Sequence, residues 1–460
     1  MKFLLALTAI PLLASNPDDQ QVRELLKQLI EIDTTAATGS TGKAAEAMAA
    51  RLVNAGFAPA DVQVLGPRPE RANLVARLHG TGTKRPVLLI SHLDVVEARR
   101  EDWTTDPFQF VEKEGYFYGR GTMDIKCADA ILVANLIRWK KENYKPDRDV
   151  IVALTANEEG GELEENGIYW LLKNHRELID AEFCVNPDGG NLETKKSRKL
   201  LNELQYAEKG FLSFALEVKN KGGHSSVPEK ENAIYRLSKG LVRLSEFDFP
   251  AVLDAGTRAY FEAVGTRQGG SAAGAINRML ETNPPDPAAL ALVAKSPDWN
   301  AKLRTTCVAT MLQAGHAENA LPQSAKATVN CRILPTEKPE DVEASIRRVM
   351  GDPEIHVAPM EKMGLVQSPP SPLRQDVTEA ARVVTSSIWP GVRVVPFVSV
   401  GATDGKHLRR AGIPTYGVSG IADDYDNIRA HGKDERIAAT ALYEGREFLY
   451  RLVTRLSSGE

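Results

Sequence analysis

Short apolar runs alternate with helical segments along this chain, and several of the runs end in an acid or a histidine. The runs occur in NLVARLHG, RPVLLISHLDVV, DVIVALTANEE and AEFCVNPDGG, and a helical stretch over 128–141 separates two of them. Short β-forming runs between helices are typical of an α/β sheet with parallel strands. His92, Glu159 and Asp188 follow three of the runs, at the edge where open α/β sheets bind ligands. The pattern predicts a mixed, mostly parallel sheet with helices on both faces and a functional site at the strand ends.

Amphipathic helical segments flank these runs. The segment DDQQVRELLKQLIEI places five apolar residues on one face, namely Val22, Leu25, Leu26, Leu29 and Ile30. The segment KAAEAMAARLVNAGF does the same with Met48, Leu52 and Val53 before Gly56 ends it. Near the C-terminus we expect a helix around 377–386, an apolar run in VRVVPFVSVGATDG and a last helix over 435–456. The α/β pattern therefore brackets a middle region of another kind.

Between residues 208 and 360 the expected order of elements becomes β-α-β-β-α-β. The expected elements are, in order, 211–218, 233–244, 305–312, 325–334, 339–350 and 354–358. This is the order of a ferredoxin-like α+β unit, so we expect an inserted domain. Residues 249–304 contain glycine-rich and proline-rich stretches and are expected to elaborate that unit. The α/β domain would then consist of two parts, 16–207 and 361–460.

The first fifteen residues, MKFLLALTAIPLLAS, have the pattern of a secretory signal peptide. A buried or membrane-surface helix is the alternative interpretation. The apolar stretch is shorter than the roughly 20 residues that cross a bilayer, and no later run is longer, so we expect no membrane partner. A signal peptide would make the protein periplasmic or secreted, where disulfides are permitted.

Size, charge and cysteine content exclude some classes of protein. The chain has 460 residues, more than one hydrophobic core usually organises, and a net charge of -4 with scattered lysines and arginines. We therefore expect no nucleic-acid partner. The four cysteines, at positions 127, 184, 307 and 331, are too few and too dispersed for a disulfide framework or a CxxC zinc site. A single bridge between Cys307 and Cys331 and unpaired buried thiols both remain open.

The residues that end the strands have the chemistry of metal ligands. In His92-Leu93-Asp94 the first and third side chains point to the same side, so Asp94 is a candidate partner for the second ring nitrogen of a metal-bound His92. Two adjacent acids, Glu158 and Glu159, follow a buried strand, where their like charges call for a cation. Alternation along a strand would let one bind metal while the other acts as a general base.

Three more candidates complete the set. Asp124 lies in GRGTMDIK, where glycines permit tight backbone geometry, although Asp124 could equally be a helix N-cap. Asp188 in NPDGG and His431 in IRAHGKDE add a carboxylate and an imidazole. This mixture of oxygen and imidazole ligands suits zinc, cobalt or manganese. Each residue alone has a structural explanation, but five at strand ends of one α/β framework favour a metal centre.

Nearly the whole chain resembles the two-zinc metallopeptidases that include aminoacylase, carboxypeptidase G, succinyl-diaminopimelate desuccinylase, carnosinase and Gly-X carboxypeptidase. The motifs that carry the resemblance are SHLDVV, GRGTMDIK, ANEEGG, NPDGG, KGGHSS, NALP, NCRILP, GATDGKHLRRAGIPTYG and HGKDE. The resemblance implies that Asp124 bridges two Zn²⁺ ions, that His92 and Asp188 complete one site, and that Glu159 and His431 complete the other. The resemblance also allows Co²⁺ or Mn²⁺ in place of Zn²⁺. Glu158 would be the general acid/base of amide hydrolysis by a zinc-bridged hydroxide.

The resemblance also makes the inserted domain a lid. It implies that His224 in KGGHSS reaches an active site across the interface of a homodimer formed through this lid. Arg332 and Asn319 would hold the substrate carboxylate, an apt role for a planar guanidinium. Gly401 and Thr403 in GATDG would belong to the substrate pocket.

Two departures from the family pattern bear on the activity. Cys127 stands where relatives commonly have glycine, so the packing behind Asp124 is expected to differ. Asp188 replaces the glutamate of aminoacylase and carboxypeptidase G, which by analogy favours hydrolysis of short peptides by a dipeptidase or carboxypeptidase. The alternative is an aminoacylase-like hydrolase of N-acyl amino acids. A catalytically inactive binding module is disfavoured because Glu158 and every expected ligand are present.

Overall fold

The structure is a computed structural model that describes residues 16–267, 269–363, 366–424 and 427–458. The expected signal peptide, residues 1–15, lies outside the described residues. The chain divides into two compact units. The first comprises the chain up to Ile179, residues 194–198 and the chain from Ser419 onward, and the second comprises residues 180–193 and 199–418.

The first unit contains four neighbouring strands of a larger sheet, in the order β1-β2-β6-β3. Its strands are β1 (Val62–Leu65), β2 (Asn73–Leu78), β3 (Val87–His92) and β6 (Val150–Thr155). Strands β3 and β6 are parallel and buried along their whole length, while β1, β2 and β6 pair antiparallel. A small antiparallel sheet adds β4 (Val111–Lys113), β5 (Tyr116–Tyr118) and β19 (Arg436–Ala438). Both ends of the central parallel pair are therefore inside the protein core.

Helices of the first unit form where the apolar periodicity predicts them. They are α1 (Pro17–Ile30), α2 (Thr41–Asn54), α3 (Lys126–Lys141), α4 (Gly167–Asn174), α5 (Arg176–Ile179) and α14 (Ala439–Ser457). Asn16 caps α1 by accepting from Asp18 N (3.1 Å), and all five predicted core residues of this helix are buried. In α2, Met48 and Leu52 are buried, but the expectation for Val53 is wrong because it is 39% exposed. Helix α14 begins later than expected because residues 436–438 pair with β5.

The second unit holds further strands of mixed direction. These are β7 (Phe183–Asn186), β9 (Arg198–Glu208), β16 (Arg393–Ser399) and β17 (Thr415–Gly417). Strand β17 is parallel to β7, β16 is parallel to β9, and β17 meets β9 antiparallel. Helices α12 (Gln375–Ile388) and α13 (Gly405–Arg410) contact β16 and β17, respectively. Of two further short strands, β18 (Ala422–Asp424) lies in the first unit, and β8 (Leu192–Lys195) is divided between the two units. The mixed, mostly parallel sheet is as predicted.

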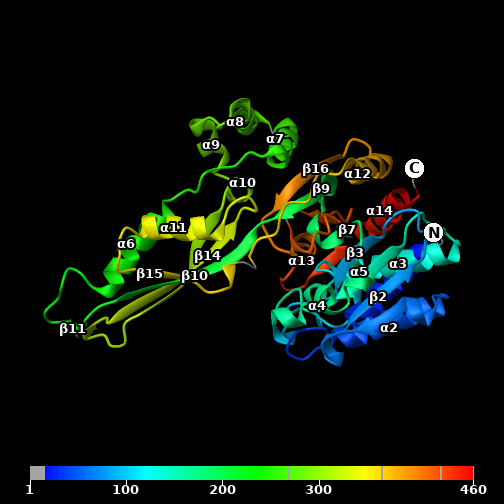
Figure 1. The fold of residues 1–460 in the computed structure, drawn as a ribbon, viewed down its shortest axis with the longest axis horizontal. Helices are drawn as coiled ribbons and strands as arrows, with labels where there is room; N and C mark the ends of the chain where they lie inside the picture. The colour runs from blue at the N-terminus through cyan, green and yellow to red at the C-terminus, as the bar shows by residue number, and fades with distance from the viewer. Residues whose placement is uncertain (1–15, 268, 364–365, 425–426, 459–460) are drawn as a thin grey trace, which may run out of the picture. The chain divides into compact units, whose positions relative to one another are not determined.

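The predicted ferredoxin-like unit is present in the second unit (Figure 1). Its elements are β10 (Gly210–Lys219), α6 (Ala233–Ser245), β12 (Thr306–Ala314), β14 (Ser324–Ile333), α11 (Pro339–Met350) and β15 (His356–Pro359). The sheet order is β12-β14-β10-β15, with every neighbouring pair antiparallel. Apolar residues of the two helices and the sheet share one core. A two-stranded ribbon, β11 (Gly223–His224) with β13 (Ala320–Leu321), extends from it.

The insertion between α6 and β12 forms four helices, α7 (Ala255–Arg267), α8 (Gly270–Glu281), α9 (Pro287–Val293) and α10 (Pro297–Leu303). Their buried residues, such as Phe261 and Ile276, share a core with Leu201 of β9 and with Val395 and Phe397 of β16. Figure 1 shows α7, α8 and α9 away from α6 and α11. The expectation that this segment elaborates the ferredoxin-like unit is therefore wrong, because its apolar faces cover β9 and β16.

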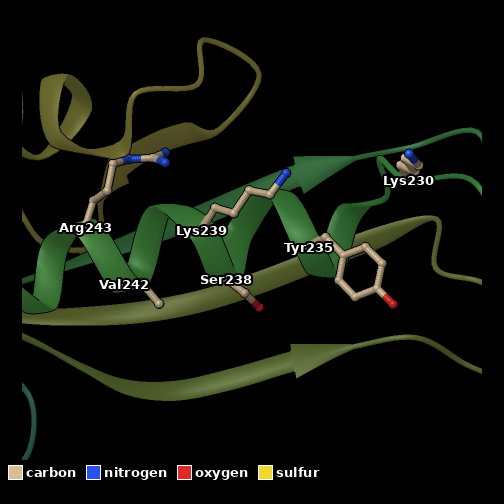
Figure 2. Close-up of a pocket in the computed structure, with 6 residues that line it drawn as sticks. All are labelled: Lys230, Tyr235, Ser238, Lys239, Val242 and Arg243. Atoms are coloured by element: carbon tan, nitrogen blue, oxygen red, sulfur yellow. The ribbon is translucent and has the colours of Figure 1, made fainter.

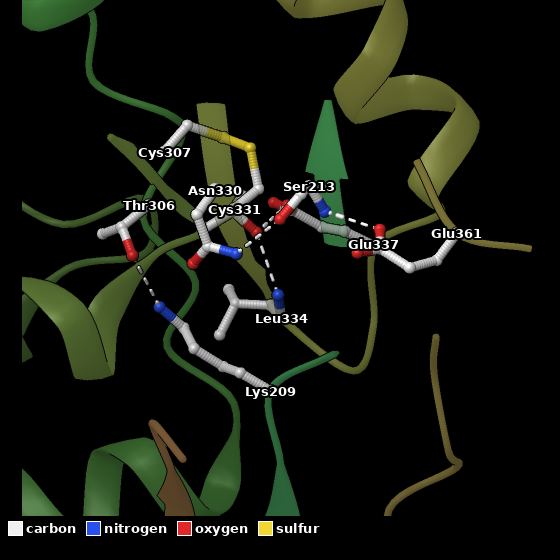
Figure 3. Close-up of a disulfide and its surroundings, with 10 residues drawn as sticks. Lys209, Ser213, Thr306, Cys307, Asn330, Cys331, Leu334, Glu337 and Glu361 are labelled. Atoms are coloured by element: carbon white, nitrogen blue, oxygen red, sulfur yellow. Dashed lines mark hydrogen bonds between the residues drawn. A yellow bond between two sulfur atoms is a disulfide. The ribbon is translucent and has the colours of Figure 1, made fainter. Parts of the chain in front are cut away.

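A disulfide joins Cys307 of β12 to Cys331 of β14, which lie opposite each other in the ladder (Figure 3). The bridge ties an edge strand to the centre of its sheet. Beside it, Lys209 Nζ donates to Thr306 Oγ1 (3.4 Å). Cys127 and Cys184 are buried free thiols. The two possibilities left open, a Cys307–Cys331 bridge and unpaired buried thiols, therefore both occur.

Within the described ranges, no helix has both the length and the apolar character needed to span a bilayer.

Candidate active site

Four side chains meet in the first unit, where β3, β6, the N-terminal end of α3 and the segment before β19 come together. His92 Nε2 lies 3.3 Å from one oxygen of Asp124, and His431 Nε2 lies 3.0 Å from the other. His431 Nε2 also lies 2.8 Å from Glu159 Oε1. Potential ligand atoms of His92, Asp124 and Glu159 all fall within 4.8 Å of one another. Asp124 stands between the two histidines, as a bridging ligand would.

His92 is the last residue of β3. Asp94, two residues later, holds both His92 and the loop that follows β6. His92 Nδ1 lies 3.0 Å from the main-chain oxygen of Asp94, so this carbonyl orients the ring and leaves Nε2 directed at Asp124. The Asp94 carboxylate accepts from the main-chain amides of Glu158 (3.1 Å) and Glu159 (3.0 Å). Asp94 therefore fixes His92 through its backbone and the two glutamates through its side chain.

Glu158 and Glu159 lie in the loop after β6, which ends at Thr155. The expectation that strand alternation separates the two carboxylates is therefore wrong, since neither residue belongs to the strand. The loop itself sets the course of the chain here, since Asn157 has a φ of 56° and the Asp94 carboxylate accepts from the amides of Glu158 and Glu159. Glu159 turns its carboxylate to His431.

The loop that presents Asp124 is held by Glu435, a residue that the sequence analysis did not single out. Glu435 is fully buried and accepts from the main-chain amides of Gly121 (3.2 Å), Met123 (2.7 Å) and Asp124 (3.0 Å). Arg120 Nη1 donates to the same carboxylate (2.6 Å). The N-cap of α3 is Ile125, so Asp124 is not a capping residue. The signal for Glu435 was its place in the quoted motif HGKDE, four residues after His431.

The charges of the cluster fit a cation. In the absence of metal, the hydrogen bonds that His431 donates to the Asp124 and Glu159 carboxylates raise its pKa to about 10. The two histidines in turn hold the pKa of the buried Asp124 carboxyl well below its usual value. Two carboxylates beside two imidazoles give the cluster a negative charge that a divalent cation would balance. Two imidazoles and two carboxylates are a donor set suited to zinc or a similar divalent metal.

Asp188 and Thr403 belong to the second unit. Asp188 lies in a 3₁₀ turn, Pro187–Gly189, that directly follows β7, and its amide donates to Asn186 Oδ1 (3.2 Å). The Thr403 hydroxyl is buried and donates to Glu208 Oε2 (2.9 Å). Gly401 N donates to Ser399 Oγ (3.2 Å). The structure places Asp188 directly after a strand, as predicted, and ties Thr403 into the protein interior.

The ribbon of the second unit brings two predicted residues together. His224 in β11 pairs with Ala320 of β13, and the amide of Ser225 donates to the main-chain oxygen of Asn319 (3.1 Å). His224 is exposed, and its Nδ1 lies 2.7 Å from Ser226 Oγ. His224 and Asn319 therefore lie side by side at one tip of the ferredoxin-like unit.

Arg332 lies elsewhere on the same sheet. It is opposite Phe211 in the β10–β14 ladder, and its guanidinium stands 4.9 Å from the centre of that ring. Partial burial lowers the pKa of Arg332. Among the residues that the structure describes, no carboxylate forms an ion pair with it. A half-buried guanidinium of this kind suits an anionic ligand.

Comparison with known proteins identifies the family. The sequence profile of the peptidase family M20/M25/M40 matches residues 88–455 of the chain. The chain belongs to this family. It is therefore a hydrolytic enzyme of a metallopeptidase family that acts on amide bonds, as the motifs predicted. The matched residues include the whole His92, Asp124, Glu159 and His431 cluster.

Individual M20 relatives differ in what they are named for. The human N-fatty-acyl-amino acid synthase/hydrolase PM20D1 is 27% identical over 459 residues, covering 96% of this chain and 89% of that protein. A probable carboxypeptidase S-like 2 of Dictyostelium discoideum is 27% identical over 381 residues, 80% of this chain and 71% of that protein. The metallo-carboxypeptidase Sso-CP2 of Sulfolobus solfataricus has the same fold, with a TM-score of 0.71 at 16% identity over 95% of this chain and 99% of that one.

Proposed function

We propose that the protein is an exported, zinc-dependent peptidase that hydrolyses short peptides as a dipeptidase or carboxypeptidase. The observation that carries this proposal is the cluster of His92, Asp124, Glu159 and His431, in which one carboxylate stands between two imidazoles. By resemblance Asp188 is the fifth ligand, so that Asp124 would be shared between two metal ions. Two bound Zn²⁺ ions would lower the pKa of a bound water and polarise the scissile carbonyl.

The chain's own residues supply the proton transfers. Glu158 directly precedes Glu159 on the same loop, and the Asp94 carboxylate accepts from both main-chain amides. We assign Glu158 the transfer of a proton from the attacking water to the leaving amide nitrogen. His224 would stabilise the oxyanion by hydrogen bonding.

The substrate's free carboxylate would be held by Arg332, together with Asn319. Support comes from the half-buried state of Arg332 and its stacking on Phe211, which leaves donor groups of the guanidinium for a bidentate contact. Both a peptide and an N-acyl amino acid carry this carboxylate.

The human relative, named for N-fatty-acyl amino acids, favours a second candidate, hydrolysis of N-acyl amino acids. The two functions share every catalytic residue proposed here. They differ in what lies on the acyl side of the scissile bond, an aminoacyl group or a simple acyl chain.

A matched substrate panel tests the choice. Zinc-supplemented protein is assayed on Gly-Leu, on N-acetyl-leucine and N-palmitoyl-leucine, and on Gly-Leu amide. We expect kcat/KM to be highest for Gly-Leu and to fall for the amide, which lacks the carboxylate. If N-palmitoyl-leucine were the one substrate of the panel that is hydrolysed, the second candidate function would be favoured over the peptidase. Hydrolysis that persists after exhaustive chelation would contradict a metal-dependent enzyme.

The same proposal includes a homodimer formed through the lid. Strand β12 is an edge strand with exposed Val308, Met311 and Leu312. Helix α6, which contacts β12, exposes Tyr235 and Val242 beside a shallow hollow of about 470 Å³. Figure 2 shows these two side chains projecting from one side of α6, away from Lys239 and Arg243. An unpaired edge with apolar side chains suits pairing with a second copy.

Export is proposed on two grounds. The N-terminal residues have the pattern of a signal peptide. The disulfide between Cys307 and Cys331 is of a kind that persists in oxidising compartments such as the periplasm.

A further inference from the structure

Glu208, the last residue of β9, has a buried carboxylate that accepts hydrogen bonds from Thr403 in the motif GATDG. Glu208 is 3% exposed, and its Oε2 accepts from the Thr403 amide (3.2 Å) and the Thr403 hydroxyl (2.9 Å). Arg409 Nη2 lies 2.7 Å from the same oxygen, and Gln205 Nε2 donates to it (3.1 Å). Thr403 is thus held by an ion pair that is itself inside the protein.

The connection continues from Thr403 to the turn after β7. Asn186 Nδ2 donates to Thr403 Oγ1 (3.2 Å), and Asn186 Oδ1 accepts from the amide of Asp188 (3.2 Å). Asn186 is 1% exposed, so both of its bonds are protected from water. A continuous set of hydrogen bonds therefore runs from Glu208 through Thr403 and Asn186 to the backbone that carries Asp188.

The chemistry of this set indicates a role beyond stability. A buried Arg–Glu pair such as Arg409–Glu208 is expensive to desolvate, and apolar residues of similar size often stabilise a core as well or better. Residues behind metal ligands, in contrast, are hydrogen-bonded so that the ligand keeps one orientation. The Thr403 hydroxyl donates to Glu208 and accepts from Asn186 and Gly405 N (3.1 Å), which commits it to the protein.

We propose that Glu208, acting through Thr403 and Asn186, is a positioning residue that orients Asp188 for metal binding. The proposal rests on the proposed function, in which Asp188 is one of the metal ligands. It assigns Thr403 to the support of that ligand and not to contact with substrate.

Metal stoichiometry tests the proposal without an activity assay. Full-length protein is equilibrated with limiting zinc, and bound metal per chain is measured by mass spectrometry together with the zinc affinity by chelator competition. The variants are Glu208→Gln, Thr403→Val, which removes the hydroxyl at similar size, and Thr403→Ser, which retains it. Glu203→Gln on the same strand is the matched control, because Glu203 has no bond to Thr403 among the described contacts.

We expect Glu208→Gln and Thr403→Val to weaken one of two metal sites by about 10- to 100-fold, with the other site unchanged. Thr403→Ser and Glu203→Gln should bind two metals as wild type does. If folded Thr403→Val or Glu208→Gln bound zinc at both sites with wild-type affinity, this inference would be overturned and the proposed function would stand. Equal weakening in Thr403→Ser and Thr403→Val would also overturn it, because the hydroxyl would then be irrelevant. A wild-type chain that binds fewer than two metals would overturn the proposed function and this inference together.

Discussion

At the scale of single residues, the proposed function gives the two adjacent glutamates after β6 different tasks. Glu159 is 2.8 Å from His431 and belongs to the ligand cluster, whereas Glu158 is assigned proton transfer. The Asp94 carboxylate holds this part of the loop, since it accepts from the main-chain amides of both glutamates.

Replacement of Glu158 by alanine should separate catalysis from metal binding. Because Glu158→Ala removes proton transfer and leaves every ligand in place, we expect kcat to fall by about 10²- to 10⁴-fold with unchanged metal content. Steady-state kinetics and metal analysis of the same preparation measure both quantities. Glu164→Ala, an exposed acid of the same segment, is the control. Near wild-type kcat in metal-replete Glu158→Ala would exclude Glu158 as the proton carrier.

His431 predicts how metal binding responds to pH. Its pKa in the metal-free protein is about 10, above the usual 6.5, because of Asp124 and Glu159. A raised pKa stabilises the folded chain fully below about pH 6.5, and this stabilisation is lost as pH rises through about 10. We therefore expect the Tm of metal-free wild type to fall more steeply from pH 7 to 10 than that of His431→Gln.

The same proton must leave when metal binds. Calorimetry near neutral pH in buffers of different ionisation enthalpy should record the release of about one more proton from wild type than from His431→Gln. Identical proton release in the two proteins would contradict a protonated His431 in the metal-free site.

The sequence predicted the candidate metal ligands better than the buried residues that position those ligands. His92, Asp124, Glu159 and His431 were predicted from residue type at strand ends, and the structure brings them together. Glu435 and Glu208 were missed because their importance lies in contacts with backbone and side chains distant in sequence. A buried acid has no local pattern that distinguishes it from a surface one.

At the scale of elements, the turn before α3 depends on glycine. Gly121 has a φ of 90°, and a Cβ there would lie 2.9 Å from both Lys126 Cδ and Val95 Cγ1. We expect Gly121→Ala to lower the free energy of unfolding by about 1–3 kcal/mol and to weaken metal binding, since the same turn presents Asp124.

Gly82 provides the control for this substitution. Its φ is 74°, and no atom lies within 4 Å of an added Cβ, so Gly82→Ala tests the strained backbone without the clash. We expect about 1–2 kcal/mol of destabilisation and unchanged zinc affinity for Gly82→Ala, measured by urea unfolding and chelator competition. If Gly121→Ala and Gly82→Ala changed zinc affinity to the same extent, the turn at Gly121 would not be what positions Asp124.

Periodicity predicted the elements well where one face alone is buried, and less well elsewhere. The core face of α1 and the six elements of the ferredoxin-like unit were predicted because alternation or helical spacing is clear there. The end of β6 and the start of α14 were misplaced, since both depend on pairing with other segments. The four inserted helices were not predicted because their partners, β9 and β16, lie far away in sequence.

At the scale of the whole molecule, the lid edge should decide the oligomeric state. Val308 and Met311 are 61% and 58% exposed on β12, so Val308→Asp with Met311→Asp should prevent edge pairing and convert a dimer to a monomer. Light scattering after gel filtration measures the mass. Leu292→Asp on α9, also an exposed apolar position, should leave the dimer intact. A monomeric wild type would refute lid-mediated dimerisation.

The bridge between Cys307 and Cys331 closes the intervening chain into a ring with a sequence separation of 24. Residues 315–319 of this ring form an exposed loop after β12, and such loops are preferred sites for proteolytic nicking. A single cut inside the ring would leave both fragments covalently attached. Such a nicked molecule would migrate as one chain on a non-reducing gel and as two after reduction, so it would keep Asn319 and Arg332 on the same particle.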